Sequence, residues 1–117
     1  MERPSKRELY NKIKQAKWLV FSDSLLIINP EVIAEDAIDL GYLIGNIKVV
    51  LLTILEEINI GHYAGAYPPK KSYESQIQNS ELFAFRWKSK YFGCDVYLKF
   101  ALKDKTFYII SLHQHRD

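Results

Sequence analysis

The chain has 117 residues, of which 48% are hydrophobic and 26% are charged. This length and composition suit one folded domain with its own core and exclude a disordered chain. Its apolar runs are much shorter than the roughly 20 residues of a membrane-spanning helix, and no apolar signal-peptide core follows the N-terminus. A single cysteine, Cys94, excludes an internal disulfide and a cysteine-rich metal site. We therefore expect a cytoplasmic protein without membrane contact.

The net charge of +2 is unevenly distributed along the chain. Residues 1–20 carry six basic and two acidic side chains, residues 21–60 carry one and seven, and residues 61–117 carry nine and five. Two basic ends around an acidic middle suit contacts with a polyanion. They suit equally well a chain whose basic ends complement its own acidic middle.

Three helices are predicted in the first half of the chain. The first begins at residues 5–8, Ser-Lys-Arg-Glu, which have the form of a capping box, and it turns a basic face outward. The second begins at Asn29-Pro30 and stops at Gly41. The third runs from Asn46 to about residue 58 and is apolar around much of its circumference, so it should be the most buried helix. Residues 18–21 are too few to assign and fit either a helix end or a short strand.

Residues 62–80 lack the apolar periodicity of the predicted helices and contain a Pro-Pro pair, two lysines and three tyrosines. A long loop or irregular arm of this kind inside a compact domain is usually functional or disordered. Lys70 and Lys71 beside Tyr73 can contact phosphate and stack a base, and they can equally form a surface that a protein partner grips. His62 lies just past the third helix, where it is either a substrate contact or a cap of the helix end.

From residue 81 the apolar period becomes two, which predicts strands near residues 83–88, 96–102 and 106–112 joined by short turns. Helices followed by strands predict an α+β fold, with about three N-terminal helices packed on a three-stranded, or slightly larger, antiparallel sheet. The predicted single domain covers residues 1–117. Its helical part spans residues 5–60, its irregular arm residues 62–80 and its sheet residues 81–113.

The last hairpin carries the candidate catalytic residues Tyr97, Lys99 and His113. Tyr97 and Lys99 are two residues apart in one strand and share a face. A two-residue turn at positions 104–105 sets Tyr97 opposite Leu112, whereas a three-residue turn sets it opposite His113, and both turn lengths are common. Because a slip of one residue reverses every side chain of a strand, the site depends on this choice.

With the longer turn, one face presents a phenol, an ammonium group and an imidazole, with Arg116 just beyond. Such a set suits RNA cleavage without a metal. A base takes the proton of the ribose 2′-OH, cations stabilise the charge on the phosphoryl oxygens, and an acid protonates the leaving 5′ oxygen. A Tyr-x-Lys pair on a half-exposed strand and a histidine near a terminus are also ordinary surface features.

Three further basic side chains, Arg86, Lys88 and Lys90, lie along one face of the preceding predicted strand. They extend a track for phosphates or merely protect a sheet edge. Three histidines and one cysteine without ligand spacing do not indicate a metal site, and no cofactor is expected.

The hairpin resembles that of the MqsR family of toxins, which is similar in fold to the RelE superfamily. The resemblance is carried by DVYLKF at residues 95–100 and YIISLH at residues 108–113, in the same order as in the family. It is supported upstream by AIDLG at residues 37–41 and by the pair His62-Tyr63. The resemblance implies a toxin that cleaves mRNA without a metal or the ribosome and is neutralised by a co-encoded antitoxin. It also implies that Tyr97 is the active tyrosine.

The sequence departs from the family at several positions. His113 stands where the family has a lysine, and Ala64 stands where a lysine follows the aromatic pair. Lys70 or Lys71 is the candidate to supply that missing charge. The family's glutamine has no clear counterpart here, and the connection from His62 to the hairpin is longer.

An RNA-cleaving toxin of a toxin–antitoxin pair, with mRNA and an antitoxin as partners, is thus the leading hypothesis. Two alternatives use the same sheet without cutting RNA. One is a protein-interaction module of the immunity or antitoxin type, and the other is an RNA-binding domain. Association of two copies of the chain also remains open.

Overall fold

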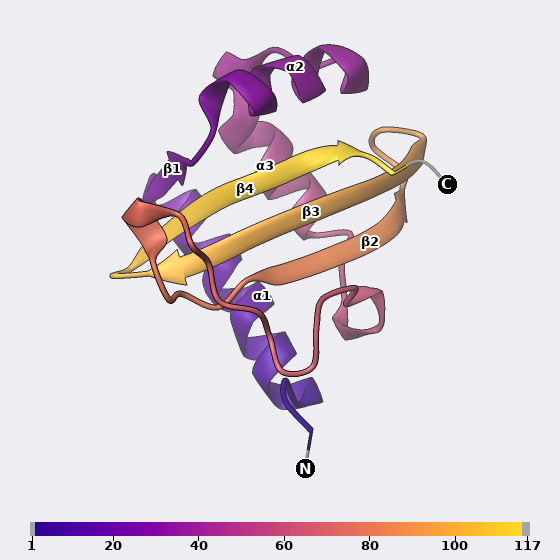
Figure 1. Ribbon diagram of the computed structural model, residues 1–117. Helices are drawn as coiled ribbons and strands as arrows, with labels where there is room; N and C mark the ends of the chain where they lie inside the picture. Colours follow the sequence, from indigo (N-terminus) through magenta and orange to yellow (C-terminus); the bar gives the residue numbers. More distant parts are fainter. Residues whose placement is uncertain (1, 116–117) are drawn as a thin grey trace.

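The computed structural model describes residues 2–115, so the predicted site residue Arg116 lies outside the described part (Figure 1). In chain order, its helices and strands are α1 (Lys6–Phe21), β1 (Leu25–Ile27), α2 (Pro30–Leu40), α3 (Ile47–Leu55), β2 (Phe83–Ser89), β3 (Cys94–Lys103) and β4 (Thr106–Gln114). Three short 3-10 turns complete it, namely η1 (Ile44–Asn46), η2 (Ile60–His62) and η3 (Ser75–Ile77).

The helices begin and end close to the predicted signals. At the start of α1, the Ser5 hydroxyl accepts a hydrogen bond from the Glu8 amide at 3.0 Å, while the Glu8 carboxylate pairs with Arg3. Helix α2 has proline at its first turn and ends at Gly41, whose φ of 85° is the left-handed conformation that glycine adopts without strain. Residues 18–21 form the end of α1.

Helix α3 is shorter than predicted, because η1 precedes it and the chain leaves the helix after Leu55. Its Leu51, Ile54 and Leu55 are fully buried, as its apolar circumference predicted. Within residues 2–115, no single helix is long and apolar enough to cross a membrane. One pair, Pro30–Leu40 with Ile44–Leu55, passes such a test by length and composition only and is bent by 95°.

The sheet is mixed and has four strands in the order β1-β4-β3-β2, which corrects the predicted antiparallel sheet of three strands. The three predicted strands form its antiparallel part. The additional strand, β1, lies between α1 and α2 in the chain and pairs in parallel with β4, with Leu25 opposite Phe107. The helices therefore do not all precede the sheet. A strand of three residues is too short to show an alternating pattern, and its partner lies near the other end of the chain.

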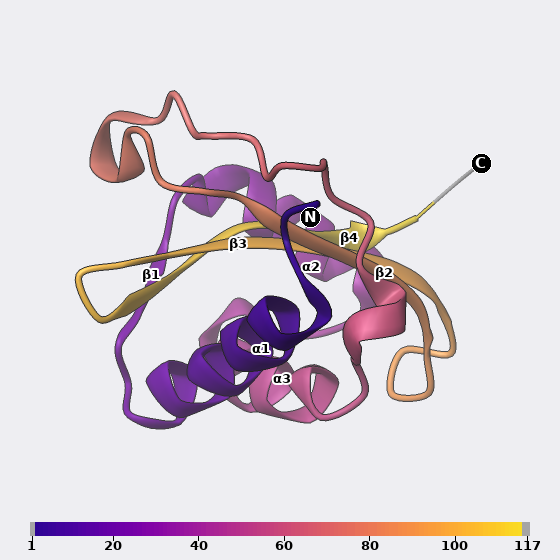
Figure 2. The ribbon, with the colours of Figure 1, turned by 90° about the horizontal axis from the view of Figure 1, so that it is seen from below.

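Helices α1 and α3 cover one face of the sheet, and the arm after η2 crosses the other face (Figure 2). The main core lies on the helical face, where Phe85, Phe100 and Phe107 stack between the strands and the helices. A smaller apolar cluster lies at one end of the opposite face, where Ile77 of η3 is fully buried beside Ala101. The arm is thus an ordered element that covers part of the second face.

Candidate active site

The turn between β3 and β4 has the shorter of the two predicted lengths. Lys103 pairs with Thr106, and the two residues between them have φ values of 50° and 57°. Left-handed φ at both central residues is characteristic of the type I′ turns that close two-residue hairpins. With a regular ladder beyond this turn, Tyr97 would face Leu112 and the candidate site would not form. The three-residue turn, which the predicted site required, is therefore not present.

A β-bulge in β4 restores the pairing that the longer turn was expected to provide. Ile110 is the extra residue of the bulge, since its two neighbours in β4 pair with the consecutive β3 residues Lys99 and Phe100. One extra residue shifts the register by one position, so Tyr97 lies directly opposite His113. Both side chains consequently point to the face away from α1 and α3.

The Tyr97 and His113 rings stack on each other, with centroids 5.2 Å apart and planes inclined by 23°. His113 Nδ1 lies 3.0 Å from the backbone oxygen of Gln114. A carbonyl oxygen can only accept a hydrogen bond, so in this contact Nδ1 carries the proton and donates the hydrogen bond. In the neutral ring, Nε2 is then the nitrogen that can accept a proton. Burial raises the pKa of the Tyr97 phenol above its ordinary value, so its hydroxyl stays protonated at neutral pH and serves as a donor.

A depression of about 380 Å³ adjoins the Tyr97 ring on the same face, and His113 is not among the residues that line it. Strands β2 and β3 form one side of it and the arm forms the other. Its lining residues are Ala64, Gly65, Ala66, Lys70, Leu82, Ala84, Tyr97 and Lys99. The depression therefore combines two predicted catalytic residues, Tyr97 and Lys99, with one of the two candidate loop lysines, Lys70.

The arm is held at this depression by specific contacts. The Ala64 amide donates to the Ala84 oxygen of β2 at 2.8 Å. The Tyr63 hydroxyl donates to the Ala66 oxygen at 2.6 Å, which closes a tight loop around Gly65. A Cβ added at Gly65 would lie 2.6 Å from the Tyr63 hydroxyl oxygen, so only glycine fits this loop without displacing the ring. The wall formed by residues 64–66 was missed from the sequence, because it uses backbone atoms and small side chains.

Strand β2 adds basic side chains to the same face. Arg86 lies directly opposite Tyr97, so Arg86, Tyr97 and His113 form one row across three strands. Lys88 lies opposite Asp95, whose carboxylate is 3.8 Å from the Arg86 guanidinium. The predicted phosphate track thus lies beside the predicted catalytic residues and contains one acidic side chain.

Besides Arg86 and Lys88, three other predicted substrate-binding residues do not line this depression. His62 is the third residue of η2, and its Nδ1 accepts a hydrogen bond from the Asn59 amide at 3.1 Å. It therefore caps the start of η2 as an acceptor, and not the end of α3, which was the predicted capping role. Lys71 is exposed and pairs through its backbone with Glu81, and Tyr73 is 98% exposed. Within residues 2–115, no group of three or more His, Cys, Asp or Glu side chains is arranged to hold a metal ion.

Comparison of the sequence with protein-family models and with curated proteins gives no match in either case. A functional hypothesis for the chain therefore depends on the geometry of this depression and on the resemblance of its hairpin.

Proposed function

We propose that this protein is a metal-independent endoribonuclease and acts as the toxin of a toxin–antitoxin pair, in the manner of the MqsR family. The observation that carries the proposal is the bulge at Ile110. It sets Tyr97 opposite His113 on an open face, beside a depression that also holds Lys70 and Lys99. A base, a proton donor and two cations are the groups that cleavage through the ribose 2′-OH requires.

In the proposed reaction, His113 Nε2 takes the proton of the 2′-OH as the 2′ oxygen attacks the adjacent phosphorus. The bond from phosphorus to the 5′ oxygen breaks, and this oxygen receives the Tyr97 phenol proton. Lys99 and Lys70 stabilise the negative charge on the non-bridging oxygens. The imidazolium then returns a proton to the phenolate, and the products carry a 2′,3′-cyclic phosphate and a 5′-hydroxyl.

The test uses the purified full chain and a labelled single-stranded RNA, with a second substrate in which every ribose is replaced by 2′-deoxyribose. We expect only the RNA to be cut, with 2′,3′-cyclic phosphate ends. His113→Ala and Tyr97→Phe should each slow cleavage by about 10²–10⁴-fold, the usual contribution of a general acid or base. Lys105→Ala is the matched control, because Lys105 is an exposed side chain in the β3–β4 turn. Cutting of the deoxy substrate, or full activity in both variants, would contradict the mechanism.

Binding of RNA without cleavage is the second candidate, because Arg86 and Lys88 give the same face a basic edge. It predicts that the protein retains labelled RNA intact and that Tyr97→Phe changes neither binding nor product. The toxin assignment has its own test. Expression should arrest growth, His113→Ala should abolish the arrest, and a small neighbouring gene should relieve it.

A further inference from the structure

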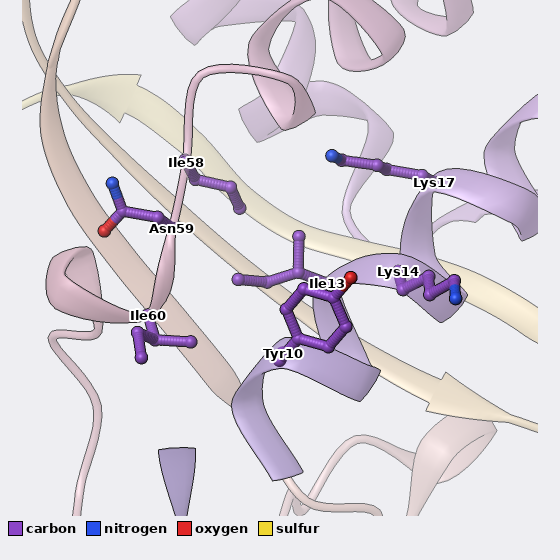
Figure 3. A pocket seen from close by; sticks show the side chains of 7 residues that line it. All are labelled: Tyr10, Ile13, Lys14, Lys17, Ile58, Asn59 and Ile60. Carbon is purple, nitrogen blue, oxygen red and sulfur yellow. The ribbon is translucent and has the colours of Figure 1, made fainter. Parts of the chain in front are cut away.

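A second depression, of about 390 Å³, lies in the helical layer, on the other side of the sheet from Tyr97 (Figures 2 and 3). It runs between α1 and the segment of residues 58–60, which ends the connection from α3 and begins η2. Figure 3 shows Ile13 of α1 facing Ile58 and Ile60 of this segment, with Lys17 extending from α1 across one end. We call this depression and its continuation along α1 the α1 groove.

The continuation is a depression of about 540 Å³ that shares Ile60 and is lined also by Leu9, Lys6 and Tyr67. The α1 groove therefore follows one side of α1 from its first turn to Lys17. Along the first depression, α1 contributes residues at positions 10, 13, 14 and 17, the spacing of one helix face. One stripe of α1 thus lines the groove over several turns.

The α1 groove joins an apolar floor to a basic rim. Ile13, Ile58 and Ile60 form the floor, and Tyr10, which is 60% exposed, stands over it. Lys6, Lys14 and Lys17 lie along the rim. Among the described residues, the lining contains one acidic side chain, Glu2, at its far end. Lys17 has one partner, Glu56, at 3.5 Å, and the Glu56 side chain is 72% exposed, so this pair is easily exchanged for another carboxylate.

From this combination we propose that the α1 groove binds an acidic amphipathic segment of a partner protein. Aliphatic side chains of the segment fill the isoleucine floor, and its carboxylates pair with Lys14 and Lys17. A nucleic acid satisfies the lysines but presents no aliphatic surface to the isoleucines, so a peptide fits the groove better. The inference does not depend on the nuclease proposal, because the side chains that it uses, Ile13, Lys14 and Lys17, lie on α1, on the other side of the sheet from Tyr97.

The test measures fluorescence anisotropy of a labelled synthetic peptide titrated with the full chain. The peptide is an amphipathic helix of about three turns, with leucine and isoleucine at positions i, i+3, i+4 and i+7 and glutamate elsewhere. We expect saturable binding that weakens by about tenfold or more in the double variant Lys14→Glu/Lys17→Glu. The matched control is Lys88→Glu/Lys90→Glu, which makes the same charge change on exposed lysines of the sheet and its turn and should bind within about twofold of the unaltered chain.

A second variant, Ile60→Ser, tests the floor independently of charge. It should weaken peptide binding while the thermal transition of the protein stays cooperative. The inference is overturned if the peptide shows no saturable binding, or if the two charge-reversed proteins lose affinity equally. It is also overturned if polyglutamate or a single-stranded RNA binds as tightly as the peptide with the same sensitivity to Lys14→Glu/Lys17→Glu, since the floor would then contribute nothing.

Discussion

The Glu57 carboxylate, just beyond α3, joins the helical layer to the hairpin between β2 and β3. It accepts hydrogen bonds from Trp87 Nε1 at 2.9 Å, the Ser89 hydroxyl at 2.7 Å and the Tyr91 amide at 2.9 Å. The Ser89 hydroxyl in turn accepts a bond from the Phe92 amide. One carboxylate therefore fixes both the end of β2 and the turn that follows, so we expect Glu57→Ala to destabilise the fold.

The size of the effect follows from the exposure of the three donors. Ser89 is 1% exposed, so without Glu57 the donor proton of its hydroxyl is left buried without an acceptor, at a cost of about 1–3 kcal/mol. Trp87 is 5% exposed, so its indole N–H is also left largely buried, at a cost of the same size. The Tyr91 amide is exposed and recovers a bond to water, which leaves about 0.5–1 kcal/mol. We expect a total loss of about 4 kcal/mol, equivalent to a fall in Tm of about 15 °C for a domain of this size.

Urea unfolding followed by circular dichroism measures this loss, and Glu56→Ala is the matched control. Glu56 is the neighbouring carboxylate, but its side chain is 72% exposed and has one ion pair, with Lys17 at 3.5 Å. Its removal should change the free energy of unfolding by less than about 0.5 kcal/mol. Equal destabilisation by the two substitutions would refute the assignment of a structural role to the Glu57 contacts.

The same contacts predict how stability depends on pH. Burial alone raises the pKa of Glu57, but the hydrogen bonds from Trp87, Ser89 and the turn amides outweigh it, so the pKa lies below its ordinary value of 4.5. The unfolded chain then binds more protons than the folded one, and the stabilisation is complete above pH 4.5 and lost as the pH falls through the lower folded-state pKa. The stability difference between the unaltered chain and Glu57→Gln should therefore shrink in acid. A difference that stays constant from neutral pH to strongly acidic pH would contradict the carboxylate's role.

Two further predictions concern the candidate active site. Deletion of Ile110 removes the bulge but keeps His113 opposite Tyr97 on the open face, so RNA cleavage should persist. An alanine inserted directly before His113 shifts the register by one residue and turns this ring toward the core, so it should abolish cleavage. Activity in the insertion variant would show that the register does not matter. Gly65→Ala should lower both cleavage and stability, the latter by about 1–3 kcal/mol, because its Cβ meets the Tyr63 ring. Gly45→Ala, with nothing within 4 Å of its added Cβ, should change neither property in thermal melts and cleavage assays.

Several elements were predictable because their causes are local. At the start of α1, the Ser5 hydroxyl accepts a hydrogen bond from the amide of Glu8, three residues further along the chain. At the end of α2, Gly41 takes a left-handed φ. The period of two after residue 81 gave the three long strands and the shared face of Tyr97 and Lys99. In each case the signal lies within a few residues of the structure that it predicts.

The sequence by itself thus determined the α+β class, most helix and strand positions, and the residues that share a strand face. Tertiary structure alone decided that Leu25–Ile27 becomes an edge strand, that the arm folds over the sheet, and that a bulge at Ile110 offsets a two-residue turn. The physical reason is that β4 must pair with two strands and pack against the core at the same time. Its apolar side chains fill the core on both sides of the bulge while its backbone pairs with β1 and β3. The position of His113 opposite Tyr97 results from that fit between distant segments, which no local pattern records.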